Sequence, residues 1–111
     1  MKKNNFYITT PIYYPSGSPH MGHAYSSILA DIFARFNRLN GNKVHFLTGT
    51  DEHGLKIQKA ANKNKLDPKT YCDKISKIFK DLTVKLNLSN DDFIRTTEKR
   101  HYDSVNDLGI D

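Results

Sequence analysis

One long amphipathic segment between two short β-like runs constrains the fold most. Apolar residues recur at steps of three and four from residue 21 to residue 39, which predicts a helix that stops at Gly41. Residues 6–10 and 44–48 are aromatic and β-branched and indicate strands, the first of them short and buried. A crossover of this length makes the two strands parallel, and the connection between them is expected to be right-handed. The fold class is therefore α/β, with both strand ends at one edge of the sheet.

The second half of the chain adds two helices, a strand and a final helix. A short helix is expected from residue 55 to about 62, and Asp67 followed by Pro68 caps another. Residues 92–96 indicate a short strand, after which Thr97 and Glu98 open the last helix. The apolar stripe of the helix after Asp67 consists of Tyr71, Ile75, Ile78, Phe79, Leu82 and Leu86.

Composition bounds the class of protein. The 111 residues are enough for one small domain, and the net charge of +5 comes largely from lysines between residues 56 and 85. Without arginine clusters or interleaved aromatic residues, these lysines indicate solvated helix faces rather than a nucleic-acid surface. Cys72 is the single cysteine, which excludes an internal disulfide and fits a reducing cytosol. No apolar run reaches membrane length, so we expect a soluble, cytoplasmic protein without membrane contact.

The sequence PHMGH, residues 19–23, predicts a site at the start of the long helix. Ser18 is the expected N-cap and Pro19 the first helical residue, which places His20 and His23 at the end of the helix that attracts anions. A glycine between the histidines lets a planar group or a phosphate approach the backbone. Ligands of open α/β sheets bind beyond the carboxyl ends of the strands, so we expect Asp51 and His53 to converge on these histidines.

Two other interpretations of these residues remain. His20 and His23 are also compatible with ordinary surface histidines at a helix start, or, together with residues 51–53, with a metal-dependent hydrolase site. The helix start and the intervening glycine favour an anion over a cation. We therefore expect no metal bound by ligands of the chain.

Several segments, in order, resemble the beginning of methionyl-tRNA synthetase, a family of class I aminoacyl-tRNA synthetases. Residues 20–23 (HMGH) match the HIGH motif of that class, with methionine where isoleucine or leucine is usual. Residues 6–14 (FYITTPIYY) and 47–54 (LTGTDEHG) are similar to the bacterial methionine enzymes, and residues 93–97 and 100–101 continue the likeness. The resemblance covers about 100 residues and implies the first half of a Rossmann-like doubly wound parallel sheet.

The resemblance also implies an activity and a set of site residues. Enzymes of this family condense methionine with ATP to methionyl adenylate and pyrophosphate, and then transfer the methionyl group to tRNA(Met). By this likeness His20 and His23 are catalytic and bind the ATP phosphates, Gly22 lies under the adenine ring, and Mg²⁺ arrives with ATP.

The methionine end of the site follows from the same likeness. Asp51 would bind the ammonium group of the amino acid through a charge-assisted contact. Pro11, Ile12 and Tyr14 would form one wall of the methionine pocket, and His53 would support the loop around it.

The resemblance further predicts parts that these residues do not include: a connective domain, a lysine-bearing KMSKS loop and a helical domain that binds the anticodon. We therefore expect residues 1–101 to be the amino-terminal part of a catalytic domain, residues 102–111 to be a divergent or truncated tail, and the chain alone to be inactive. A complementing carboxyl-terminal fragment would be its partner.

Half of a doubly wound sheet leaves a strand edge and apolar helix faces uncovered, which predicts marginal stability. The alternatives are a non-catalytic remnant or interaction module and, less favoured, a related nucleotidyl transferase.

Overall fold

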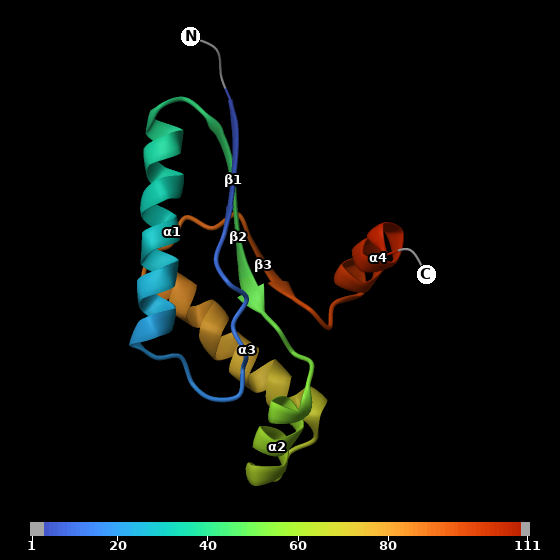
Figure 1. Cartoon of the computed structure of the whole chain (residues 1–111). Coiled ribbons are helices and arrows are strands. Elements are labelled where there is room, and N and C mark those ends of the chain that lie inside the picture. Colours follow the sequence, from blue (N-terminus) through green and yellow to red (C-terminus); the bar gives the residue numbers. More distant parts are fainter. Residues whose placement is uncertain (1–3, 110–111) are drawn as a thin grey trace.

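The computed structural model describes residues 4–109 and contains a three-stranded parallel sheet with four helices (Figure 1). The strands lie in the order β1-β2-β3, with Phe6 opposite Val44 and Leu47 opposite Asp92. This arrangement confirms the predicted parallel α/β topology. The elements in chain order are β1 (Asn5–Thr9), α1 (Met21–Leu39), β2 (Lys43–Thr50), α2 (Leu55–Lys63), α3 (Pro68–Lys85), β3 (Asp92–Arg95) and α4 (Lys99–Leu108).

Helix α1 begins later than the sequence indicates. Its first residue is Met21 and its N-cap is His20, so the prediction of Ser18 as N-cap and Pro19 as first helical residue was wrong. The physical reason is that an imidazole nitrogen, rather than a serine hydroxyl, accepts the free backbone N–H at this helix start. The other end agrees with the prediction, because Gly41 follows the helix with a φ of +83°.

Small residues, not the large apolar ones, attach α1 to the sheet. Ala30 and Ala34 form a buried cluster with Phe46 of β2, and Ile8 and Val44 pack against it. The predicted apolar stripe of α1 is instead exposed to solvent, which agrees with the expectation of an uncovered helix face. It consists of Met21, Tyr25, Ile28, Leu29, Ile32, Phe33, Phe36 and Leu39.

Strand β1 is half exposed rather than buried, so that prediction was wrong. The strand lies at an edge of the sheet, and its residues alternate between exposed and partly buried. Tyr7 stacks on His45 of β2 with ring centroids 5.6 Å apart, yet Tyr7 remains 63% exposed. Helices cover both faces of a complete doubly wound sheet. Here the surface around Tyr7 and His45 is open.

Helices α2 and α3 form a compact unit with its own core. Asp67 caps α3 by accepting a hydrogen bond from the backbone N–H of Thr70, as the sequence predicts. Of the predicted stripe, Tyr71, Ile75 and Phe79 are buried, whereas Ile78 is 38% exposed. The core of this unit consists of Ile57, Ala61, Tyr71, Cys72, Ile75 and Phe79.

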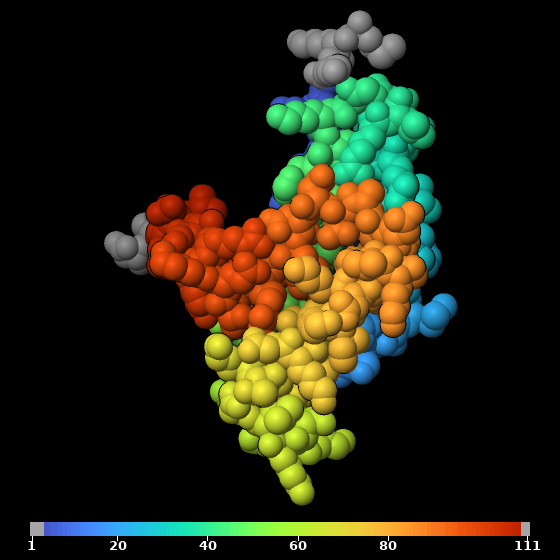
Figure 2. All heavy atoms as spheres, turned by 180° about the vertical axis from the view of Figure 1, so that it is seen from behind, coloured from blue at the N-terminus to red at the C-terminus, as the bar shows by residue number. Residues whose placement is uncertain are grey.

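The molecule is flat and extended for its size. Its radius of gyration is 15.7 Å, against about 13 Å for a compact domain of this length, and its extents are 55 × 38 × 16 Å. Helix α4 projects away from the sheet and has no buried residue (Figures 1 and 2). Within residues 4–109 no helix combines the length and the apolar content that a bilayer crossing needs. Residues 110–111 of the predicted tail lie outside the described residues.

Candidate functional site

A cavity of about 440 Å³ opens beyond the carboxyl end of β1, beside the start of α1. Five of the residues predicted from the sequence lie in its wall, namely Pro11, Ile12, Tyr14, His20 and His23. The structure therefore brings the two histidines and the predicted methionine-pocket residues to one place. The remaining wall is formed by Tyr13, Ser16, Gly17 and Ser18.

His20 and His23 cap the start of α1 reciprocally. Nδ1 of His20 accepts the backbone N–H of Gly22 at 3.0 Å, and Nδ1 of His23 accepts the backbone N–H of His20 at 3.0 Å. This is the geometry of a capping box, with two imidazoles in place of the usual hydroxyl and carboxylate. The two rings stack with centroids 3.9 Å apart.

The caps fix the protonation of both rings. A nitrogen that accepts a hydrogen bond carries no proton, so the proton of each neutral imidazole lies on Nε2. Each ring can thus donate an N–H from Nε2 to a ligand while Nδ1 holds the helix start. Burial, and then the neighbouring His20, lower the pKa of His23 below its ordinary value of 6.5, which favours this neutral form at pH 7.

Gly22 makes the histidine cap possible. A Cβ at this position would lie 2.9 Å from Cε1 and 3.1 Å from Nδ1 of His20. The ring of His20 therefore occupies the space that a side chain at residue 22 would fill. This is a second reason for glycine here, beside the close approach of a ligand that the sequence suggests.

Asp51 follows β2 and is joined to the cavity through Tyr13. Its backbone N–H donates to the carbonyl oxygen of Tyr13 at 2.9 Å, and Tyr13 pairs with Thr50 as an isolated parallel bridge. Asp51 itself is not among the described residues that line the cavity. The structure therefore brings its backbone to the site, and the participation of its carboxylate stays a prediction.

His53 contacts the segment after β3 and is not among the described residues that line the cavity. Its Nε2 lies 3.3 Å from the carbonyl oxygen of Thr96 and 3.4 Å from the hydroxyl of Tyr102. Its backbone N–H donates to Oδ1 of Asp51 at 3.4 Å. These contacts connect the loop after β2 with the segment that leads into α4. The supporting role of His53 stays a prediction.

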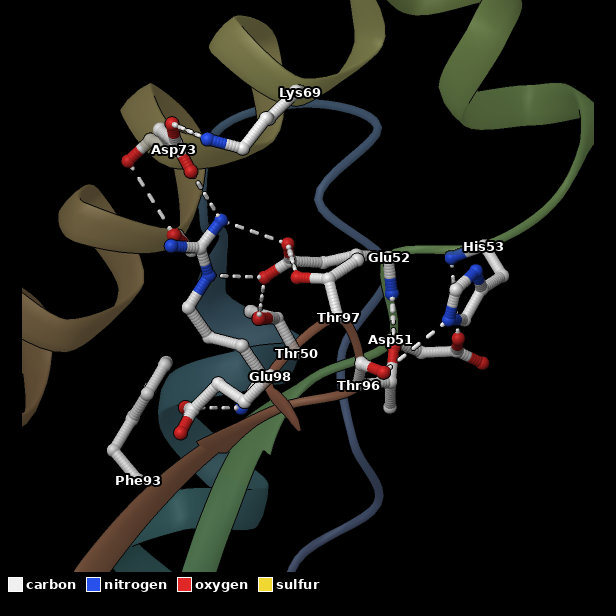
Figure 3. A network of polar contacts seen from close by, with 12 residues as sticks. Thr50, Asp51, Glu52, His53, Lys69, Asp73, Phe93, Thr96, Thr97 and Glu98 are labelled. Atoms are coloured by element: carbon white, nitrogen blue, oxygen red, sulfur yellow. Dashed lines mark hydrogen bonds and ion pairs between the residues drawn. The ribbon is translucent and has the colours of Figure 1, made fainter. Parts of the chain in front are cut away.

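A buried carboxylate between Asp51 and His53 locks the same loop onto β3 (Figure 3). The side chain of Glu52 is fully buried and accepts hydrogen bonds from Nε and Nη2 of Arg95 at 2.7 and 2.9 Å. Thr50 and Thr97 donate their hydroxyls to the same carboxylate at 2.7 and 2.8 Å. Both carboxylates around it, Glu52 and Asp73, raise the pKa of Arg95 and keep it charged.

A second cavity, of about 400 Å³, adjoins this network and is lined in part by Cys72. Burial raises the pKa of the Cys72 thiol to about 11, so it stays protonated and unreactive at neutral pH. Within residues 4–109 no three or more His, Cys, Asp or Glu side chains are grouped to hold a metal ion.

Tyr13 and Arg95 had no role predicted from the sequence, and Glu52 was predicted only as one possible metal ligand. Tyr13 follows the end of β1 by four residues and resumes the pairing with β2. Strand alternation would have placed it on the exposed face of Tyr7 and Thr9, so no local signal indicated its inward contacts. Glu52 lies between Asp51 and His53, both of which had predicted site roles, so its structural role was not considered. An arginine at the end of the neighbouring strand β3 was the available signal for a buried ion pair.

Comparison with known proteins points to one family. The family model described as "tRNA synthetases class I (M)" matches residues 6–109. The chain is 58% identical over 103 residues to a methionine–tRNA ligase of Rickettsia prowazekii and 56% identical over 104 residues to methionine–tRNA ligase 1 of Bacillus cereus. These matches cover 93% and 94% of this chain, but 20% and 16% of the relatives.

A solved structure has the same fold. The methionyl-tRNA synthetase of Mycobacterium tuberculosis in complex with methionyl-adenylate is 44% identical, with a TM-score of 0.92. The match covers 95% of this chain and 21% of that protein. The chain thus spans about a fifth of the length of these relatives.

Proposed function

Because the chain belongs to the methionyl-tRNA synthetase family of class I tRNA synthetases, we propose that it supplies part of a site that activates methionine with ATP. The observation that carries the proposal is the pair of histidine rings that cap the start of α1 at the wall of the cavity. In both rings Nδ1 accepts a backbone N–H, so Nε2–H can donate to a ligand. Two N–H donors side by side suit the oxygens of a polyphosphate.

In the proposed reaction, a carboxylate oxygen of methionine attacks the α-phosphorus of ATP. The bond between the α-phosphorus and the bridging oxygen breaks, and pyrophosphate leaves with the electron pair. His20 and His23 would donate from Nε2 to phosphate oxygens on which negative charge increases in the transition state. Gly22 would lie beneath the adenine ring, and Mg²⁺ would enter with ATP.

The amino acid would lie against the other wall of the same cavity. The backbone of Ile12 and the ring of Tyr14, with Pro11 beside them, offer an apolar surface for the thioether side chain. The carboxylate of Asp51, whose backbone hydrogen bonds to Tyr13, would accept the ammonium group. A wall from outside this chain would have to complete the pocket, because one apolar surface separates similar side chains by only about 1 to 3 kcal/mol.

We expect that this completing wall belongs to the remainder of a synthetase. The relatives are about five times longer than the matched region, and the exposed stripe of α1 provides a large apolar surface for such a partner. In that complex, tRNA(Met) would bind through the complementing piece rather than through these residues.

An interaction module that retains the fold without the chemistry is the second candidate. The exposed stripe of α1 favours it, since a surface of this kind fits a protein partner whether or not catalysis follows. The two candidates differ in whether the histidines matter once the partner is bound.

Methionine-dependent exchange of labelled pyrophosphate into ATP tests the proposal. The chain would be mixed with a separately produced remainder of the R. prowazekii enzyme, which begins where the similarity to this chain ends. We expect no exchange from either piece alone and measurable exchange from the mixture. His23→Asn keeps an acceptor near the position of Nδ1 but removes Nε2, so it should lower the exchange rate by about 10²- to 10³-fold.

His101→Asn is the matched control, since His101 lies on α4, away from the cavity. Equal exchange by His23→Asn and the wild-type mixture would contradict the proposed chemistry and favour the interaction module.

A further inference from the structure

Tyr13 contacts both His23, which the proposed function assigns to the phosphates of ATP, and Asp51, which it assigns to the ammonium group of methionine. Its backbone N–H donates to the carbonyl oxygen of Gly49 at 3.0 Å, and its own carbonyl oxygen accepts the N–H of Asp51 at 2.9 Å. This pair of bonds clamps residue 13 beside the end of β2. The position of the Asp51 backbone is therefore set by Tyr13 on one side, while Glu52 anchors the next residue to β3.

The side chain of Tyr13 reaches the start of α1. Its hydroxyl donates to the carbonyl oxygen of His23 at 3.3 Å and shares a hydrogen bond with the hydroxyl of Ser27 at 3.0 Å. Its ring meets the imidazole of His23 edge-on, with centroids 4.7 Å apart and planes at 61°. The backbone, the hydroxyl and the ring of this one residue thus each contact a different part of the site.

Phe79 of α3 also packs edge-on against the imidazole of His23. Its ring centroid lies 5.0 Å from that of His23 and 5.9 Å from that of Tyr13, and Phe79 is itself buried. Two aromatic rings from different segments therefore limit the movement of His23. Its stacking on His20 limits movement on a further side.

We infer that Tyr13 is a positioning residue, which holds the imidazole of His23 and the backbone of Asp51 at a fixed separation. The inference rests on the proposed function, because it assigns these two groups to the phosphate and the amino acid of one substrate pair. Tyr13 would act through His23 and Asp51 rather than on the reacting atoms. A misplacement of about 1 Å in such a group can lower a rate by about 100-fold.

Two substitutions separate the parts of this role in the chain itself. Tyr13→Phe keeps the ring and removes the hydroxyl contacts to His23 and Ser27, so the carbonyl ¹³C resonance of His23 should shift while the pKa of His23 stays low. Tyr13→Leu removes the ring and admits water, so the pKa of His23 should rise toward 6.5. Tyr25→Phe is the matched control, because Tyr25 is an exposed tyrosine of α1, the helix that contains His23, and it should change neither signal.

The pKa is read from the imidazole proton resonances of His23 during a pH titration. Unchanged His23 signals in both Tyr13 variants would overturn the inference, and if Tyr13→Leu fails to fold, the carbonyl resonance in Tyr13→Phe decides alone. Pyrophosphate exchange by the complemented pair is measured in parallel, where Tyr13→Leu should reduce kcat by about 10-fold or more with a smaller effect on KM for methionine. No exchange with the wild-type chain, but displaced His23 signals in the variants, would reject the proposed function and leave the structural coupling of Tyr13 to His23 standing.

Discussion

The two sides of this small molecule differ in how many of their large apolar side chains are buried. Helices α2 and α3 bury six residues in a core of their own, including two aromatic rings. Helix α1 buries two alanines against Phe46 and exposes its large apolar side chains. The difference follows from where each helix finds its partner, because α3 packs on α2 and on the sheet, whereas only small residues of α1 meet the sheet.

This contrast explains how the site can be well ordered within an open molecule. His23 contacts both Tyr13 and Phe79, so the closed side of the molecule supports the start of α1, where the candidate site lies. The outer surface of α1 has no such support among residues 4–109 and is available to another protein surface. Substitutions on the closed side should therefore cost far more stability than equally large ones on the open side.

Phe79→Ala should have the largest effect. Phe79 is 3% exposed, and removal of a buried phenylalanine ring destabilises a protein by about 3 to 5 kcal/mol. Phe36→Ala on the exposed stripe, where the ring is 60% exposed, should change the free energy of unfolding by less than about 0.5 kcal/mol. Urea unfolding of both variants measures the difference. Similar losses in the free energy of unfolding would contradict the contrast between the buried and the exposed side.

Arg95→Met tests the ion pair that locks the loop after β2. It leaves the fully buried carboxylate of Glu52 without its charged partner, which should cost about 3 kcal/mol. Lys77→Met removes the exposed pair with Asp81 and should cost about 0 to 1 kcal/mol. The same unfolding measurement applies, and a loss below that of the control would mean that Glu52 does not depend on Arg95.

Gly49→Ala tests the close approach of β2 and β3. A Cβ at residue 49 would meet the backbone carbonyl oxygen of Ile94 at a distance that no real contact allows, so the strands would have to separate. We expect a loss of about 2 to 3 kcal/mol. Gly17→Ala, where a Cβ meets nothing within 4 Å, is the control and should be nearly neutral in thermal unfolding.

Acid should weaken the start of α1 before it weakens the carboxylate caps. The folded pKa of His23 is lowered below 6.5, so the unfolded chain binds more protons and stability falls as the pH drops below about 6.5. The pKa of Asp67, lowered mainly by hydrogen bonds from Thr70, makes a contribution that is lost only as the pH falls below its ordinary value of 3.8. We expect the His23 effect to be the smallest of the effects predicted.

Unfolding curves between pH 7.5 and 5 measure this effect. The slope should flatten in His23→Asn, which keeps an acceptor for the cap but does not titrate. An equal slope in that variant would assign the pH dependence to other groups.

Strong local signals made much of the fold predictable. The Asp67-Pro68 cap and the apolar period of α3 fixed one helix almost to the residue, and β-branched runs located β2 and β3. The start of α1 was misplaced because Ser18-Pro19 is a common cap, while capping by His20 depends on the paired ring of His23. Propensities describe residues one at a time and do not contain such a reciprocal arrangement.

Part of the cavity wall was predictable from the sequence, but the contacts that support it were not. The resemblance to the family named residues on the cavity wall, and the apolar period with the Ser18-Pro19 signal placed His20 and His23 near a helix start, although the cap itself was misassigned. The clamp by Tyr13 and the network around Glu52 depend on contacts between residues far apart in sequence. A period of 3.6 also shows which face of α1 is apolar, but not whether anything covers that face.

Solvent exposure of isoleucine methyl groups, measured by NMR with a soluble paramagnetic agent at low protein concentration, tests the contrast most directly. In the chain alone, Ile32 on the outer face of α1 should relax fast and Ile57 and Ile75 in the α2–α3 core should not, as their exposed fractions of 57%, 2% and 7% require. Adding the remainder of the R. prowazekii enzyme should protect Ile32 and leave the other two unchanged. Protection of Ile32 in the chain alone, or its continued exposure in a mixture that exchanges pyrophosphate, would contradict the account.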